Sequence, residues 1–221
     1  SRLVGKGECM AAAIAGVRGL SGPEKRVWIQ MAAAVYPVQA YLERIAVPGE
    51  TAECLHCPGQ RETQGHFLCE CPQFRKARTE AHNRAWRKIG EVMEPCLPVG
   101  SRVWWDRPMG ATDLTLQPVR APDPDRPGEE VLHSPSQLAR LQPDGVVVHE
   151  AKRRIVLLEF TRPNDGWDDA LWQAAARKDG KYRLLLHALR GYARAGWTVQ
   201  LHALPVGVMG TLHLAHWVPA M

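Results

Sequence analysis

Hydrophobic residues recur at helical spacing soon after a helix start signal near the beginning of the chain. The start signal is Ser21-Gly-Pro, and Glu24 stands three residues after Ser21, which is the offset of a capping box. The apolar positions that follow at helical spacing are Val27, Met31, Ala34 and Val35. The pattern predicts a helix that begins near Ser21 and that Pro37 ends or kinks. Residues 1–47 are expected to be largely helical.

A second amphipathic pattern covers residues 73–93, "QFRKARTEAHNRAWRKIGEVM". One side of the predicted helix is an apolar stripe: Phe74, Ala77, Ala81, Ala85 and Ile89. The remaining surface is strongly basic: Arg75, Lys76, Arg78, Arg84, Arg87 and Lys88. Such a helix is expected to contact phosphates.

The pattern changes again after residue 95. Residues 95–135 are rich in proline and have few periodic runs, so "QPVRAPDPDRPGEE" is expected to be an exposed loop or linker. From residue 136, two β-branched runs, "PDGVVVHE" and "RRIVLLEFT", are joined by a charged turn. A helical stretch and the closing run "WTVQLHALPVGVMG" follow. This β-β-α-β order predicts a mixed sheet with a helix packed on it.

Composition and charge bear on whether the protein spans a membrane, is secreted or binds nucleic acid. About 45% of the 221 residues are hydrophobic, but no apolar run approaches the ~18 residues that a membrane span needs. We see no signal peptide, and we expect no membrane partner. Because the chain begins at Ser1 rather than Met, we expect it to be an excised part of a longer protein. A net charge of +5 suits a nucleic-acid partner without demonstrating one.

Four of the six cysteines crowd into residues 54–71, beside a histidine. Such clustering favours a metal and a reducing compartment over a disulfide framework. The spacing Cys-x2-Cys-x8-His-x4-Cys supplies three thiolates and one imidazole, which is the closed tetrahedral set of structural zinc. The predicted ligands are Cys54, Cys57, His66 and Cys71. Cys69 is a weaker rival for the fourth position.

Two acids mark a second candidate site. Asp144 precedes the first β-branched run and Glu159 lies near the end of the second, so an antiparallel hairpin would bring them to the same end of the sheet. Their carboxylates could then share Mg²⁺ or Mn²⁺, which would polarise a phosphodiester and activate water. The alternative is a pair of ordinary strand-end acids. Glu150-Ala-Lys152 also has an acid-x-lysine form, but it falls in the hairpin turn and is expected to be solvated.

The helix after this hairpin carries a lysine in an apolar stripe: Leu171, Ala174, Lys178, Tyr182, Leu185, Leu189 and Tyr192. A lysine on a buried face is costly unless it meets a carboxylate or a phosphate. Lys181 lies one turn away from Lys178 and directly before Tyr182. Lys178 fits the inward stripe better, whereas Lys181 is beside the flexible Gly180, so the order of the two lysines stays open.

The chain resembles a known family over roughly residues 25–210. The resemblance rests on five segments that follow one another in the same order: the cysteine cluster, "RTEAHNRAW", "QPDGVVV", "IVLLEFT" and "KDGKY". The family is the C-terminal region of site-specific non-LTR retrotransposon proteins, in which a CCHC zinc knuckle precedes a restriction-like, PD-(D/E)xK-like endonuclease. The resemblance implies an α+β fold: a helical N-terminal part with a zinc knuckle, then a restriction-endonuclease-like mixed β-sheet flanked by helices. The expected regions are a helical linker at 1–50, the knuckle and basic helix at 51–94, and the endonuclease at 95–221.

The resemblance also assigns residues. The catalytic acids fall on Asp144 and Glu159, and Thr161 stands where an ancestral nuclease has its lysine, since the family's lysine has moved to the following helix. Its lysine-tyrosine group falls on Lys178, Lys181 and Tyr182. The segment after the knuckle carries Arg78 and His82, which are expected to lie closest to the nucleic acid.

The implied function is a metal-dependent DNA endonuclease that nicks target DNA so that the freed end primes reverse transcription. Structural Zn²⁺, catalytic Mg²⁺ or Mn²⁺, a DNA target, RNA of the element, a reverse-transcriptase region N-terminal to this chain and a nuclear location are the corresponding expectations. Two alternatives stay open: a nucleic-acid-binding knuckle on an inactive nuclease scaffold, and a repair or recombination nuclease of the same superfamily.

Overall fold

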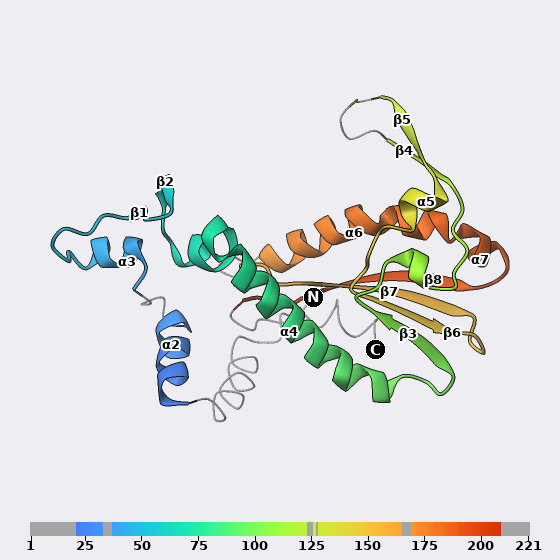
Figure 1. Cartoon of the computed structure of the whole chain (residues 1–221), viewed down its shortest axis with the longest axis horizontal. Helices are drawn as coiled ribbons and strands as arrows, with labels where there is room; N and C mark the ends of the chain where they lie inside the picture. The colour runs from blue at the N-terminus through green and yellow to red at the C-terminus, as the bar shows by residue number, and fades with distance from the viewer. Residues whose placement is uncertain (1–20, 33–36, 123–125, 127, 165–168, 209–221) are drawn as a thin grey trace. The chain divides into compact units, whose positions relative to one another are not determined.

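The computed structural model describes residues 21–32, 37–122, 126, 128–164 and 169–208, which form two compact units (Figure 1). One unit holds the described residues up to Ala85, together with Arg162–Trp172 and those from Pro205 onward. The other unit holds Trp86–Thr161 and Gln173–Leu204. The chain therefore crosses between the units several times, and neither unit is one continuous segment.

The first unit begins with short helices and ends in a small cysteine-rich fold. Its elements are α2 (Gly22–Ala32), α3 (Gln39–Arg44), β1 (Glu53–Cys54), β2 (Cys57–Arg61), the π-helical turn η1 (His66–Glu70) and the 3-10 turn η2 (Pro72–Phe74). The start predicted for α2 is present, because the Ser21 backbone N–H donates to the Glu24 carboxylate at 2.8 Å. Residues 1–20 and 33–36, part of the predicted helical region, lie outside the described residues.

The basic helix is confirmed as α4 (Arg75–Met93), followed by the short turn η3 (Glu94–Cys96). Of the predicted apolar stripe, Phe74, Ala81, Ala85 and Ile89 are half-buried and Ala77 is exposed. The fully buried residues of α4 are the neighbouring Trp86 and Gly90. Gly90 faces Trp105, and a Cβ there would make ordinary van der Waals contact with the indole at 3.4 Å. A small residue and an indole are thus the most deeply buried part of the inward face.

The second unit is built on a four-stranded sheet. Its strands, in spatial order, are β3 (Ser101–Trp105), β6 (Gly145–His149), β7 (Arg154–Thr161) and β8 (Thr198–Pro205). Both β3 and β7 pair with β6 in antiparallel register. β7 and β8 begin side by side, because the Thr198 backbone N–H donates to the Arg153 carbonyl oxygen at 2.8 Å. The sheet is therefore mixed, as the β-β-α-β order predicts.

The helical stretch between β7 and β8 forms α6 (Ala170–Ala188) and the short α7 (Arg190–Arg194). Val146, Val148, Ile155 and Leu157 share one face of the sheet and pack with Tyr182, Leu185 and Leu189 in the main core. α6 therefore runs along that face of the sheet (Figure 1), where Tyr182 and Leu185 of its predicted stripe are buried.

The predicted loop at residues 117–130 is only partly a loop. It contains β4 (Val119–Pro122) and the first residue of β5 (Glu130–His133), which pair as a two-stranded antiparallel sheet, labelled in Figure 1. Two short turns lie on either side of this region in the sequence, η4 (Met109–Ala111) and α5 (Pro135–Leu138). The prolines had suggested a loop, but Pro122 is the last residue of β4 in a two-stranded sheet, and a missing backbone N–H is tolerated at that position. None of the described helices is both long and apolar enough to cross a membrane.

Candidate functional site

The cysteine cluster closes into one small site in the first unit. The ligand atoms of Cys54, Cys57, His66 and Cys71 all lie within 4.8 Å of one another. The Cys71 Sγ is 3.9 Å from that of Cys54 and 3.7 Å from that of Cys57. The π-helical turn brings the last two ligands together, since the Cys71 backbone N–H donates to the His66 carbonyl oxygen at 2.8 Å. Four residues from one short segment thus form a buried Cys3His cluster that could hold a metal ion such as zinc.

The donor set suits a metal better than it suits a packed core. The His66 Nε2 atom is buried and has no hydrogen-bond partner among the described residues, although buried polar atoms normally have one. The His66 Nδ1 atom lies 3.7 Å from the Glu70 carboxylate, which is beyond hydrogen-bond distance but leaves the carboxylate on the side of the ring opposite to Nε2. Burial, together with the neighbouring thiols, raises the pKa of Cys57 to about 11. Without a metal the Cys57 thiol therefore binds a proton at neutral pH, and a metal must displace that proton.

Cys69 is not in this cluster, so the prediction that Cys71 supplies the fourth ligand agrees with the geometry. Arg78 fixes the backbone of that ligand, because its guanidinium donates to the Cys71 carbonyl oxygen at 2.5 Å. Arg78 was expected to lie closest to the nucleic acid, and here it also braces the cluster.

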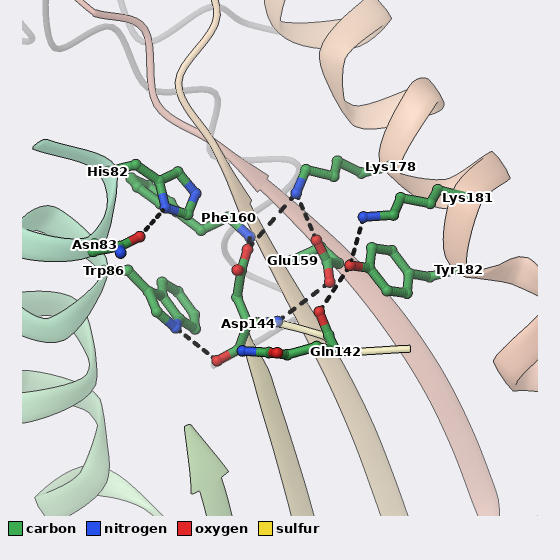
Figure 2. A network of polar contacts seen from close by, with 10 residues as sticks. All are labelled: His82, Asn83, Trp86, Gln142, Asp144, Glu159, Phe160, Lys178, Lys181 and Tyr182. Carbon is green, nitrogen blue, oxygen red and sulfur yellow. Dashed lines mark hydrogen bonds and ion pairs between the residues drawn. The ribbon is translucent and has the colours of Figure 1, made fainter. Parts of the chain in front are cut away.

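The two predicted acids of the second unit also meet. The pairing Gly145↔Leu158 places Asp144 opposite Glu159, one position beyond the strand. The Asp144 backbone N–H donates to a Glu159 carboxylate oxygen at 3.2 Å, and the Phe160 backbone N–H donates to Asp144 Oδ2 at 2.7 Å. The hairpin therefore brings both carboxylates to the same end of the sheet, as expected from the spacing (Figure 2).

Lys178 reaches both acids from α6. Its Nζ atom lies 2.7 Å from Glu159 Oε2 and 3.8 Å from Asp144 Oδ2. Glu159 is fully buried, and burial followed by the nearby charge of Asp144 raises its pKa to about 7, although Lys178 opposes the shift. A carboxyl group with such a pKa beside a second acid and a lysine is typical of a functional site.

Lys181 and Tyr182 make a different set of contacts. The Lys181 Nζ atom donates to the Tyr182 hydroxyl oxygen at 2.9 Å and lies 4.5 Å from the centre of its ring. The Tyr182 hydroxyl in turn donates to the Gln142 carbonyl oxygen at 2.8 Å. Burial, followed by the charge of Glu159, raises the pKa of Tyr182 above its ordinary value. Lys178 is thus the lysine that contacts the acids, while Lys181 contacts the tyrosine (Figure 2).

The acid-x-lysine sequence in the hairpin turn stays away from these groups. Lys152 is exposed in the turn between β6 and β7, at the end of the hairpin opposite to Asp144. Its Glu150 neighbour pairs with Arg102 at 2.6 Å. The expectation that this turn is solvated is confirmed.

The predicted phosphate-binding residues all lie on α4, where six basic and two acidic side chains leave a net charge of +4. Lys76 and Lys88 pair with glutamates on the same helix, Glu80 and Glu91. The exposed Arg75, Arg84 and Arg87 take part in no ion pair within the part of the chain that the structure describes. The His82 Nδ1 atom lies 3.2 Å from the side-chain oxygen of Asn83.

The sequence did not reveal the groups that hold Asp144 from its backbone side. The Trp86 indole N–H donates to the Asp144 carbonyl oxygen at 2.7 Å, and the Asp106 backbone N–H donates to the same oxygen at 3.0 Å. Gln142 donates to the Asp106 carbonyl oxygen at 2.9 Å. The position of Trp86 among basic residues was the signal in the sequence that this side chain has a buried partner, since an indole is seldom left in water.

Models of protein families and the curated proteins contain no match to this chain.

Proposed function

We propose that this protein is a metal-dependent DNA endonuclease that nicks its target. The observation that supports the proposal most directly is the convergence of Asp144, Glu159 and Lys178, with both carboxylates within 4 Å of one ammonium group. Two acids that can hold a divalent cation and a lysine beside them can support metal-assisted phosphodiester hydrolysis. This arrangement also agrees with the restriction-like endonuclease fold implied by the sequence resemblance.

Asp144 and Glu159 would be the ligands of Mg²⁺ or Mn²⁺, because carboxylate oxygens are the donors that these hard cations prefer. Lys178 already places a positive charge between the two acids, so this position favours a cation. A divalent ion bound there would polarise the phosphodiester and lower the pKa of an attacking water.

Lys178 has the second role in this proposal. Once the acids neutralise a divalent cation, the ammonium group no longer has to neutralise Glu159 and can hold a phosphate oxygen or orient water. Lys181 is the next cation along α6, and its contact with Tyr182 leaves it exposed enough to hold a neighbouring phosphate.

The basic face of α4 would bind the DNA backbone. Arg75, Arg84 and Arg87 are exposed and carry no acidic partner among the described ion pairs, so their charge is available to phosphates.

The segment that contains the cysteine cluster has the opposite charge balance to α4. Residues 50–71 contain four glutamates and one arginine, which suits a structural zinc site better than a phosphate-binding surface.

The wider context rests on the sequence resemblance alone. We propose that the nick primes reverse transcription of a non-LTR retrotransposon in the nucleus, with RNA of the element as a further partner. The polymerase would lie N-terminal to this chain in the full protein. A repair or recombination nuclease would use the same site, and the sequence that precedes this chain would distinguish the two.

A plasmid-nicking assay tests the proposal. Purified protein with Mg²⁺ should convert supercoiled DNA to open circles, Asp144→Ala should abolish conversion, and Lys152→Ala should leave it unchanged. DNA binding is measured in parallel so that each variant is compared at equal occupancy. Binding without nicking by the unaltered protein would favour the inactive scaffold, and full activity of Asp144→Ala would mean that the active site lies elsewhere.

A further inference from the structure

Trp86 connects the basic helix to the backbone of Asp144. It is 1% exposed, and its indole N–H makes the 2.7 Å bond to the Asp144 carbonyl oxygen, as Figure 2 shows. The same ring stacks on Phe160 with 5.6 Å between centroids and 20° between planes. Phe160 is also the residue whose backbone N–H donates to Asp144 Oδ2. One side chain therefore touches both the backbone of the acid and the residue that binds its carboxylate.

The surroundings leave the indole little freedom to move. Trp105 meets it edge to face, with 5.4 Å between centroids and 78° between planes. Gly145, directly after Asp144, lies under both rings: a Cβ there would come within 2.7 Å of Trp105 and 3.2 Å of Trp86. Any larger residue at 145 would have to displace rigid aromatic rings. The absence of a side chain at Gly145 is thus what permits the ring to lie against the strand that follows Asp144.

We propose that Trp86 is a positioning residue for the nuclease site. The inference rests on the proposed function. Asp144 lies one position before β6 (Gly145–His149), so its peptide is not held by the full ladder of the sheet. The indole N–H and the Asp106 N–H together fix the Asp144 carbonyl, and the stacked Phe160 fixes the carboxylate. Trp86 acts through Asp144 and touches neither DNA nor the reacting phosphate.

The two neighbouring tryptophans, Trp86 and Trp105, differ in the partners of their indole N–H groups. The Trp105 indole N–H donates to the exposed Glu94 carboxylate at 3.0 Å and has no bond to Asp144. Trp86 and Trp105 therefore share packing but not hydrogen bonding. Trp105→Phe is a matched control that removes an indole from the same aromatic cluster.

The experiment compares Trp86→Phe with Trp105→Phe in the full chain. A third protein carries benzothienylalanine at position 86, in which sulfur replaces the indole N–H and ring size is kept. For each, three quantities are measured: the melting temperature, the affinity for Mn²⁺ by electron paramagnetic resonance, and the nicking kcat and KM. Loss of one neutral hydrogen bond should lower kcat and weaken Mn²⁺ binding by up to about ten-fold in both position-86 proteins. KM for DNA should stay unchanged, and Trp105→Phe should match the unaltered protein.

Several results would overturn the inference. If benzothienylalanine at position 86 leaves kcat and Mn²⁺ affinity unchanged, or if Trp105→Phe loses as much as Trp86→Phe, the role of Trp86 is packing alone. If the unaltered protein does not nick DNA, the proposed function fails, and Mn²⁺ affinity then decides this inference: weaker binding in the two position-86 proteins supports it. Equal binding, or no binding by the unaltered protein, overturns it.

Discussion

The raised pKa of Glu159 leads to a specific pH dependence of folding stability. In the folded protein this pKa is about 7, compared with the ordinary 4.5 expected for the unfolded chain. Between these values the folded state binds a proton that the unfolded state does not, so stability must fall as the pH rises. Below 4.5 both states are protonated, and above 7 both are ionised, so the effect is confined to that window.

The size of the effect follows from the two pKa values. Linkage gives a loss of about 2 kcal/mol in the free energy of unfolding between pH 5.5 and pH 8, attributable to Glu159 alone. For a chain of this length that corresponds to roughly 4–8 °C in melting temperature. Because Glu159 is fully buried, solvent screening does not reduce this change in stability.

Glu159→Gln isolates this contribution. The amide keeps an oxygen acceptor for the Asp144 N–H but cannot titrate. Between pH 5.5 and pH 8, the unaltered protein should therefore lose about 2 kcal/mol more of its free energy of unfolding than Glu159→Gln loses. The assay is thermal or urea unfolding without added Mg²⁺ and with zinc retained, at pH 5.5, 6.5, 7.5 and 8. Glu150→Gln is the control, since Glu150 is exposed in the hairpin turn. Parallel pH profiles for the unaltered protein and Glu159→Gln would refute the reasoning.

The remaining predictions concern the lysine, the metal cluster and the basic helix. Lys178→Met should lower the nicking rate on the order of 100-fold. It should also tighten Mn²⁺ binding at pH 8, because the ammonium group competes with the cation for the same carboxylates. If Lys178→Met nicks normally and Lys181→Met does not, Lys181 is the catalytic lysine. Purified protein should contain one zinc per chain, and Cys57→Ser should lose the metal and lower the melting temperature; a protein without zinc by elemental analysis would contradict this. Neutralising Arg84 and Arg87 together should reduce the salt slope of DNA binding by about two ions, and an unchanged slope would mean that α4 is only a solvated surface.

Local patterns in the sequence were sufficient for the parts of both sites that depend on spacing. The Cys-x2-Cys-x8-His-x4-Cys run identified the four clustered ligands, because a tight turn and a short helical turn leave few ways to bring such residues together. The distance between Asp144 and Glu159 was equally informative, since antiparallel pairing around one turn fixes which positions face each other. Lys178 was found because a charge in an apolar stripe must meet an opposite charge.

The tertiary structure decided what spacing cannot encode. The most deeply buried residues of α4 are an indole and a glycine that lie against Trp105, which the period of the apolar stripe did not identify. The bond from Trp86 to Asp144 joins residues 58 positions apart, and nothing in either segment specifies the other. The choice between Lys178 and Lys181 as partner of the acids likewise depends on how α6 is rotated over the sheet. Periodicity shows which residues share a face, but shape complementarity between distant elements decides which of them meet, and that exists only once the chain has packed.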